Sequence, residues 1–456
     1  MARWVLSGVA MKAVVVSAVP QGSSSLSAIA ETLDGELRRA GYETIRRFEV
    51  TTLKLGYCQG EFDCWVHTPG RCKIHDAEQD ITAAIPDADA LVLLGPVAFG
   101  GFSHAQKRAI DRLIGLITPF FERRNALTHH APRYAHYPKL HALGWLPKRN
   151  PEQSTIFDAL NDAMAINLCA PTRSSAVLDD EHVELRQATI RRMLEASSPA
   201  GATLDDRDAL RRELLDAARP GPQRARPAPK TAALLVGSAK PKGASASECA
   251  ARAFEQRLEA LGVACRLHHA TEFVHEGVPA LAAARSIAEA DLFLLATPLY
   301  VDSLPSLATH ALELVARARG SNGNLAAFVP FINCGFPEAE QTRTAVRIAR
   351  QFAALANYDF AGALPLGGGG VLTPDRSLEP GEGRPPVGHV VRALDLTAPA
   401  LALGGPVPDA ALQAIIEPPL PDVLYRLIAD LGFRWEARRQ GTAQRELRAT
   451  PFASPR

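Results

Sequence analysis

Short, continuous apolar runs recur along the chain, and amphipathic segments separate them. Residues 13–16 (AVVV), 90–94 (ALVLL) and 140–146 (LHALGWL) are such runs in the first part of the chain. Apolar runs of this length, bounded by turn residues, predict strands that are buried on both faces. The segments between them, such as 26–40 and 155–167, have the spacing of helices. Alternating strands and helices predict a parallel sheet covered on both faces.

The same order starts again after a linker. Residues 219–230 (RPGPQRARPAPK) are too rich in proline and arginine to build a core, and they predict an extended connection. Beyond it, the apolar runs at 232–236, 291–296 and 326–332 again alternate with predicted helices. We therefore expect an α/β chain with two doubly wound parallel sheets, each a three-layer α/β/α domain, in tandem.

The expected boundaries follow from these patterns. The first domain covers 11–200, a helix and the linker cover 201–230, the second domain covers 231–437, and a polar tail covers 438–456. The tail is basic, and we expect it to fray.

Composition narrows the function classes. The net charge of +1 over 456 residues gives no electrostatic footprint for nucleic acid or an anionic membrane. No apolar run reaches the length of a membrane span, and the first residues lack a cleavage site. We expect a cytoplasmic protein, without nucleic-acid or membrane partners, whose seven cysteines are thiols or ligands rather than disulfides.

The loop after the first predicted strand, residues 17–25 (SAVPQGSSS), opens a helix. Helix starts offer unpaired N–H groups to anions, and serine hydroxyls add donors. The candidate phosphate-binding residues are Ser17, Pro20, Gly22, Ser23, Ser24 and Ser25. The alternative is a capped turn that binds nothing.

The loop after the third predicted strand, residues 96–103 (PVAFGGFS), places two glycines beside two aromatics. Such a loop suits a flat ring lying against backbone. The alternative is a hydrophobic loop that packs under the neighbouring helix. The candidate ring-binding residues are Pro96, Val97, Ala98, Phe99, Gly100 and Gly101.

Three segments in this order resemble a known family. They are SAVPQGSSS, the cysteine-bearing YCQGEFDCWVHTPGRCKIHD at 57–76, and GPVAFGGFSHAQKRAIDR at 95–112. Together they are similar to the flavodoxin-like NAD(P)H-dependent FMN reductases, a group that includes the iron–sulfur flavoproteins. The resemblance implies a flavodoxin-like fold and a non-covalent FMN on the two loops above. The family usually has tyrosine where this chain has Ala98, and Trp65 or Phe99 could substitute for it.

The cysteine loop leaves several alternatives open. Cys58, Cys64 and Cys72 stand where the iron–sulfur branch has four cysteines, and Glu61 occupies the region of the fourth. Three thiolates make a poor cluster site, and zinc would need His67 or His75 as a further ligand. We expect a structural loop near the flavin edge and no metal.

Two later loops add candidates. Residues 147–154 (PKRNPEQS) could approach the flavin or a nicotinamide phosphate, although a solvated loop is the simpler interpretation. In the second domain, Lys240 and Lys242 favour a phosphate, but the third-strand loop lacks the double glycine. That domain either holds a second FMN or is degenerate. Its candidate residues are Ser238, Ser245, Ser247, Pro298, Leu299, Tyr300, Asn333 and Gly335.

The resemblance implies an FMN-dependent NAD(P)H oxidoreductase that reduces a quinone, free flavin or another small acceptor. The alternatives are a non-enzymatic flavodoxin-like electron-transfer or binding module and an iron–sulfur flavoprotein. We identify no side-chain acid or base, and Lys107 and Asp111 look like a structural i, i+4 pair. Because the family forms oligomers, we expect a homodimer or an intramolecular pseudo-dimer in which the second domain covers the flavin.

Overall fold

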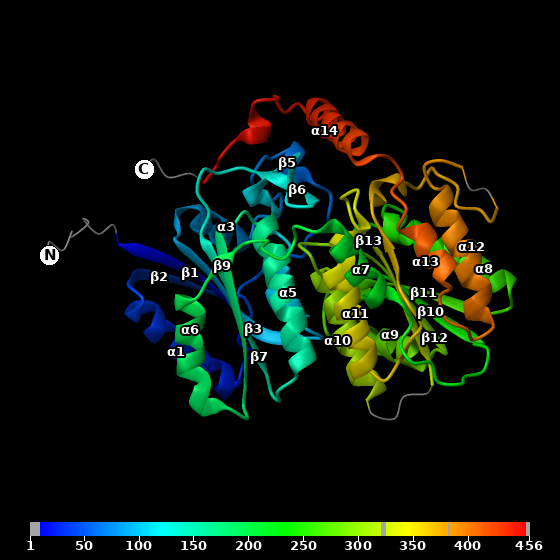
Figure 1. The fold of residues 1–456 in the computed structure, drawn as a ribbon, viewed down its shortest axis with the longest axis horizontal. Coiled ribbons are helices and arrows are strands. Elements are labelled where there is room, and N and C mark those ends of the chain that lie inside the picture. The colour runs from blue at the N-terminus through cyan, green and yellow to red at the C-terminus, as the bar shows by residue number, and fades with distance from the viewer. Residues whose placement is uncertain (1–9, 321–324, 382–383, 453–456) are drawn as a thin grey trace.

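The computed structural model describes residues 10–320, 325–381 and 384–452, and it contains two parallel sheets side by side (Figure 1). We call residues 10–200 the first half and residues 231–416 the second half. Helices cover both faces of each sheet, as the alternation of apolar runs predicts.

The sheet of the first half runs in the order β2–β1–β3–β7–β8, and all these neighbours are parallel. In chain order this is 2-1-3-4-5, the order of flavodoxin-like folds. A short antiparallel strand extends the edge, and another pairs with the end of β3. The bounds are β1 Met11–Ser17, β2 Tyr42–Glu49, β3 Ala90–Ala98, β4 Gly101–Phe102, β7 Lys139–Leu146, β8 Thr172–Asp179 and β9 Ser198–Pro199.

The sheet of the second half repeats this order. Its strands run β11–β10–β12–β13–β14, with β15 also pairing with β13, and every pair is parallel. The flavodoxin-like fold expected for two domains in tandem is therefore confirmed. The bounds are β10 Thr231–Val236, β11 Ala264–His269, β12 Leu292–Pro298, β13 Ala327–Asn333, β14 Asp359–Phe360 and β15 Leu364–Leu366.

Alternation along the strands of the first half creates two cores. Ala13 and Val15 point to one face and pack on α1 (Ser24–Arg39) and α6 (Arg186–Glu195). Val14 and Val16 point to the other face, toward α3 (Glu78–Ala84), α4 (His104–Ile110) and α5 (Pro151–Asn167). This second core is continuous with the core of the second half.

The second half is layered in the same way. The helices that cover its two faces are α8 Ala246–Ala260, α9 Val278–Glu289, α10 Ser306–Arg319, α11 Arg343–Leu355, α12 Gly388–Ala402 and α13 Asp409–Ile415. Before it, α7 (Arg207–Ala218) packs on α11, and residues 219–230 form neither helix nor strand.

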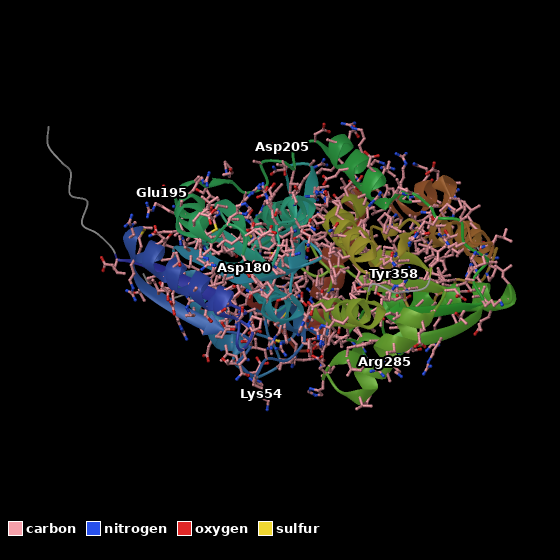
Figure 2. All side chains as sticks on the ribbon, turned by 90° about the horizontal axis from the view of Figure 1, so that it is seen from below. Lys54, Asp180, Glu195, Asp205, Arg285 and Tyr358 are labelled. Carbon is pink, nitrogen blue, oxygen red and sulfur yellow. The ribbon has the colours of Figure 1, made fainter. Side chains whose placement is uncertain are left out.

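Equivalent helices meet where the two halves join. The helices after the third strands, α4 and α10, pack against each other, and so do those after the fourth strands, α5 and α11. Like elements packing on like is the arrangement of an isologous dimer interface. Phe99 and Phe352 contact across this seam with ring centroids 5.2 Å apart, and side chains fill the seam densely (Figure 2).

Three features go beyond the sequence prediction. A hairpin of β5 (Ile117–Arg124) and β6 (Leu127–Pro132) extends from the first half, beside the short α2 (Asp63–Val66). After α13, α14 (Asp422–Arg439) lies across both halves (Figure 1). Within the described residues, no helix is both long enough and apolar enough to cross a membrane.

The expectation that the tail frays is wrong for residues 438–452. Leu447 is fully buried, and the buried Arg133 of the first half donates to the carbonyls of Leu447 (3.2 Å) and Ala449 (2.7 Å). A buried guanidinium needs acceptors, and the tail supplies them.

Candidate functional site

The third strand of each half ends in a tight hairpin, and the two hairpins have similar backbones. Phe99 and Gly100 have φ of 57° and 87°, and the equivalent Val301 and Asp302 have φ of 44° and 59°. A β-branched residue such as Val301 rarely adopts this left-handed region, so the second hairpin is strained. Strain of this kind persists where surrounding contacts enforce it, and it concentrates at functional sites.

The first half supplies those contacts. Asn167, at the end of α5, donates to both carboxylate oxygens of Asp302 at 2.8 and 2.9 Å. The Lys107 ammonium pairs with Asp111 (2.5 Å) and also donates to the carbonyl of Tyr300. Asp111 in turn accepts from the N–H of Ser306 at 2.8 Å. Lys107 and Asp111 thus form the structural pair that the sequence predicts, and they hold the hairpin of the opposite half.

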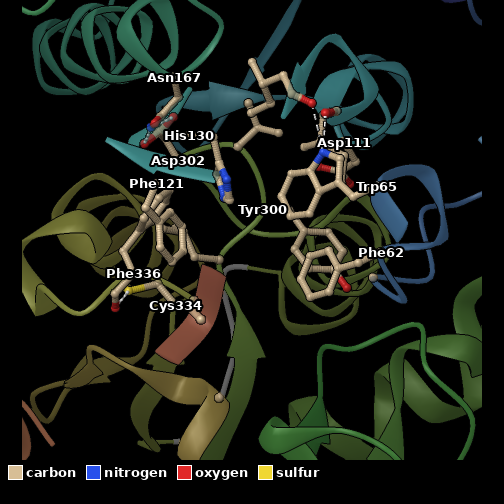
Figure 3. Close-up of a pocket in the computed structure, with 18 of the residues that line it drawn as sticks. Phe62, Trp65, Asp111, Phe121, His130, Asn167, Tyr300, Asp302, Cys334 and Phe336 are labelled. Carbon is tan, nitrogen blue, oxygen red and sulfur yellow. Dashed lines mark hydrogen bonds between the residues drawn. The ribbon is translucent and has the colours of Figure 1, made fainter. Parts of the chain in front are cut away.

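Above this hairpin lies a cavity of about 250 Å³ between the two halves (Figure 3). The hairpin of the second half and the loop after β13 form its floor, while the cysteine loop, the β5–β6 hairpin and α14 enclose it. Ligands of open parallel sheets bind in this position, beyond the carboxyl ends of the strands. The aromatic residues of its lining are Phe62, Trp65, Phe121, His130, Tyr300, Phe336, Tyr425 and Phe433.

The aromatic walls are ordered by contacts with one another. Phe62 and Trp65 stack with centroids 5.0 Å apart and planes within 4°, and Phe433 meets both edge-on. The Trp65 indole N–H donates to the carbonyls of Ile114 (2.9 Å) and Ile117 (3.1 Å), which fixes the ring. A cavity lined by aromatic side chains in this way suits a planar aromatic ligand.

Gly60 in the cysteine loop makes the closest approach to the hairpin. Its φ is +69°, and a Cβ placed there would lie 1.8 Å from the Tyr300 hydroxyl oxygen. Only glycine can adopt this positive φ and also approach the Tyr300 hydroxyl this closely. The cysteine loop is thus fitted to the hairpin of the second half.

Burial shifts the pKa values of several ionisable groups that line the cavity. Burial lowers the pKa of His130 to about 3, so its ring is neutral at pH 7. Burial also raises the pKa of the Cys58 and Cys334 thiols, and that of the Tyr300 phenol. The Asp302 pKa is raised by burial, partly offset by the Asn167 hydrogen bonds. Burial thus shifts these groups toward their neutral forms.

The candidate residues of the second half lie together beside this cavity. Leu299, Tyr300 and Gly335 line it, and the N–H of Leu299 donates to the carbonyl of Asn333 at 2.8 Å. The Ser247 hydroxyl donates to the Asn333 side chain at 2.8 Å, which joins the first loop to the fourth strand. Pro298 ends β12, while Ser238 is buried in the first loop and Ser245 caps α8.

Lys240 belongs to the first loop of the second half. Burial lowers the pKa of Lys240, and the nearby carboxylate of Glu61 on the cysteine loop partly offsets this effect. The lysine is therefore half-buried at the boundary between the first loop of the second half and the cover provided by the first half. A cation here favours a phosphate.

The candidate ring loop of the first half has different surroundings. The N–H of Gly100 donates to Gln153 at 3.1 Å, and a Cβ on Gly100 would lie 2.7 Å from Ile156. A Cβ on Gly101 would lie 3.0 Å from Ile348 of α11. Val97 and Phe99 are buried, and Pro96 and Ala98 are half-buried at the edge of an open hollow. The double glycine therefore allows close packing of helices.

The first loop of the first half is mostly exposed. Ser23 caps α1, Gly22 has φ of +82°, and Ser24 and Ser25 begin the helix. Ser17 is buried, and its hydroxyl donates to Glu49 at 2.9 Å. The remaining candidate, Pro20, is exposed in the turn.

Two other predicted features lie apart from the cavity. In residues 147–154, Asn150 caps α5 and Arg149 faces a separate hollow with Asp179. Among the cysteines, Cys58 lines the cavity and Cys64 is buried close to Cys58 and Cys72. Across the described residues, no three His, Cys, Asp or Glu side chains gather in an arrangement that could bind a metal ion.

Several lining residues escaped the sequence analysis. Phe121 and His130 come from the unpredicted hairpin, and Tyr425 and Phe433 come from α14. The glycine run at residues 367–370 also contributes to the cavity. The N–H of Gly369 donates to the Cys334 carbonyl (2.7 Å), and Gly370 lines the cavity. The sequence signal that could have indicated the aromatic wall lies in residues 57–76, because Phe62 and Trp65 stand in that segment.

Comparisons with known proteins agree with the predicted resemblance. Residues 11–129 match the sequence model of the NADPH-dependent FMN reductase family, which confirms the resemblance for that part of the chain. An iron–sulfur flavoprotein from Archaeoglobus fulgidus is 26% identical over 104 residues, 23% of this chain. That match spans 46% of the archaeal protein, so the chain covers about half the length of this curated relative.

Solved structures resemble parts of the chain. The NAD(P)H:quinone oxidoreductase from Methanothermobacter marburgensis is 14% identical, with 41% of this chain and 98% of that protein covered and a TM-score of 0.32. An FMN-dependent NADH-azoreductase from Bacillus anthracis is 13% identical, with 43% and 100% covered and a TM-score of 0.30.

Proposed function

We propose that the chain is an FMN-dependent oxidoreductase that takes electrons from NAD(P)H and passes them to a quinone, free flavin or another small acceptor. The observation that carries this proposal is the aromatic cavity between the halves, at the edge of the sheet where flavodoxin-like folds bind ligands. The family match of residues 11–129 and the names of the relatives point to the same cofactor.

The residues of the second half fit FMN. The ring would lie between the Leu299–Asp302 hairpin and the stacked Phe62 and Trp65. The phosphate would lie at the start of α8, where Ser238 and Lys240 provide donors and positive charge. The cavity is mostly apolar with few polar groups, as in most cofactor sites.

Bound FMN would supply the redox chemistry, accepting a hydride from NAD(P)H and returning two electrons to the acceptor. The chain's own residues bind and orient. Lys107 and Asp111 hold the hairpin, Asn167 fixes Asp302, and the aromatic walls exclude water. Backbone N–H groups of the strained hairpin provide fixed dipoles next to the ring site.

The α14 helix controls access to the cavity. Its Tyr425 hydroxyl donates to the Gly335 carbonyl at 3.0 Å, and its Asp430 accepts from the N–H of Phe121 at 3.2 Å. The helix therefore bridges the loop after β13 and the β5–β6 hairpin. NAD(P)H and the acceptor would reach the ring beside this helix.

Reconstitution tests the proposal. Apoprotein titrated with FMN should quench the flavin fluorescence, and the complex should consume NAD(P)H when a quinone is added. Trp65→Leu should weaken FMN binding, whereas Trp435→Leu, on the exposed outer face of α14, should leave it unchanged. A protein that shows no affinity for FMN would refute the proposed function.

A further inference from the structure

Each half has a first loop of the kind that binds phosphate, but a carboxylate lies inside the loop of the first half. Glu49, the last residue of β2, accepts from the N–H of Val19 (2.9 Å), the hydroxyl of Ser17 (2.9 Å) and the N–H of Thr51 (3.2 Å). The Thr51 hydroxyl is also 2.7 Å from the same carboxylate. Three residues at the start of this loop and after β2, Ser17, Val19 and Thr51, thus already donate to an anion of the chain itself.

The second half lacks this arrangement. Strand pairing aligns Ser17 with Glu49 in the first half and Val236 with His269 in the second, so an imidazole occupies the position of the carboxylate. The residue equivalent to Val19 is Ser238, and its N–H donates to no other described residue. A carboxylate does approach this loop from the first turn of α8, where Glu248 accepts from the N–H of Gly243 at 2.5 Å.

Glu248 differs from Glu49 in its ionic partners. It pairs with Arg252 at 2.8 Å, so a guanidinium compensates its charge, and it lies 3.4 Å from the His269 ring. No Lys, Arg or His in the described part of the chain lies within 4.0 Å of the Glu49 carboxylate. Its negative charge is therefore directed at the loop, where it would repel a phosphate.

On the ring side of the first half, packing between helices uses the double glycine. Phe99, Gly100 and Gly101 pack into α5 and α11, as described above. An open hollow of about 540 Å³ remains beside Pro20, Pro96 and Ala98, and Glu313 and Arg317 of α10 also line it. Among the described residues, its lining includes the charged Arg108, Glu313 and Arg317 and no Phe, Tyr or Trp.

We propose that the chain binds one FMN, on the second half, and that the first half serves as the cover of that site, with Glu49 closing its own phosphate loop. The inference rests on the proposed function and assigns its cofactor. The half that matches the FMN reductase family by sequence thus contributes the cysteine loop and the aromatic wall, while the unmatched half binds the phosphate and the ring.

The FMN content of the full chain is the first test. Apoprotein saturated with FMN and freed of excess ligand should contain one FMN per chain, measured by absorbance after denaturation. Two FMN per chain would overturn the inference and leave the proposed function intact. No FMN at all would instead refute the proposed function, so the two failures are distinguishable.

Paired variants locate the site. Lys240→Gln with Lys242→Gln should weaken FMN binding about tenfold, because a charged hydrogen bond to phosphate is lost. Ser24→Ala with Ser25→Ala, in the first loop of the first half, should leave the dissociation constant within twofold. The opposite result, weaker binding only in the serine variant, would place the flavin in the first half and overturn the inference. Circular dichroism would show that all variants are folded.

The role of Glu49 has its own measurement. With FMN saturating the chain, inorganic phosphate should not raise the melting temperature of the wild type beyond the effect of equal ionic strength. Glu49→Gln keeps an acceptor for Val19 but removes the charge, and phosphate should then stabilise it. An equal response of the wild type and Glu49→Gln to phosphate would overturn the role of this carboxylate.

Discussion

The hairpins that end β3 and β12 share a left-handed pair of residues, yet their surroundings differ. In the first half the pair is Phe99–Gly100, and its neighbours are the side chains of α5 and α11. In the second half the pair is Val301–Asp302, which faces a cavity and is braced by Asn167 and Lys107. The sequence with two glycines looks more suited to a ring, but its glycines are used for packing between helices. Local sequence sets the shape of such a loop, and the partners across the interface decide what the loop contacts.

The largest effect on the free energy of unfolding should come from removing Lys107, which holds the Val301–Asp302 hairpin. Lys107→Met leaves Asp111 charged and fully buried without its partner, which costs about 3–5 kcal/mol of unfolding free energy. Urea unfolding measures this cost. The equivalent residue of α10 is Thr309, whose hydroxyl only bonds the Pro305 carbonyl, so Thr309→Val should cost about 1 kcal/mol.

A double variant separates charge from packing at the same place. Lys107→Met combined with Asp111→Leu removes both charges and should recover most of the loss. If Lys107→Met alone were no more costly than Thr309→Val, the two third-strand hairpins would not differ in their support.

The next largest effect should come from Gly60→Ala. The new methyl group would meet the Tyr300 hydroxyl, and alanine at φ of +69° is itself strained, which together cost about 2–4 kcal/mol. FMN binding should weaken as well, because the cysteine loop is displaced from the hairpin. In the background of Tyr300→Phe the cost should be smaller, as the hydroxyl is gone. If Gly60→Ala lowered the free energy of unfolding equally in the wild-type and Tyr300→Phe backgrounds, the cysteine loop would not be packed against this hairpin.

Much of the architecture could be predicted from the sequence, because it depends on local patterns. Apolar runs such as 90–94 and 291–296 have the length of buried strands, and both are strands in the structure. The alternation of strands and helices predicts a doubly wound parallel sheet, and the family resemblance implies its flavodoxin-like order. The family resemblance of the first 120 or so residues was likewise present in three short segments.

The cavity could not be predicted in the same way, because its walls come from distant parts of the chain. Phe62, Phe121, Tyr300 and Phe433 meet only after the two halves pack and α14 crosses them. The role of Glu49 was equally hidden, since a carboxylate at the end of a strand has no sequence signature. Contacts between the two halves determine that the Phe99–Gly100 hairpin is packed by helices and that the Val301–Asp302 hairpin faces a cavity.

A smaller effect should appear on acidification. Burial lowers the pKa of His130 to about 3, whereas an unfolded histidine titrates near 6.5. The unfolded chain then binds more protons below pH 6.5, so the folded state loses stability as the pH falls from 6.5 toward 3. Between pH 6.5 and 5 the loss is about 1–2 kcal/mol for this one group.

Variants of two histidines test whether His130, in the first half, causes this loss of stability at acidic pH. His130→Phe keeps a ring between Trp65 and Phe336 but cannot titrate, so its stability should change less between pH 6.5 and 5. His275→Ala, at an exposed position of the second half, should retain the full dependence. An identical pH dependence in wild type and His130→Phe would show that this histidine does not contribute.

The smallest change gives the most direct comparison of the two halves. Gly22 and Gly243 both have φ of +82° in the first loops, and a Cβ at either position meets nothing within 4 Å. Alanine should therefore cost each loop the same free energy, about 1 kcal/mol, through backbone strain alone. Since stability responds equally, any difference in FMN affinity reports which loop contacts the phosphate. We expect Gly243→Ala to weaken FMN binding several-fold and Gly22→Ala to leave it unchanged, as measured by fluorescence titration. Equal weakening in both variants would mean that both loops bind flavin, and the difference between the halves would then lie in their packing alone.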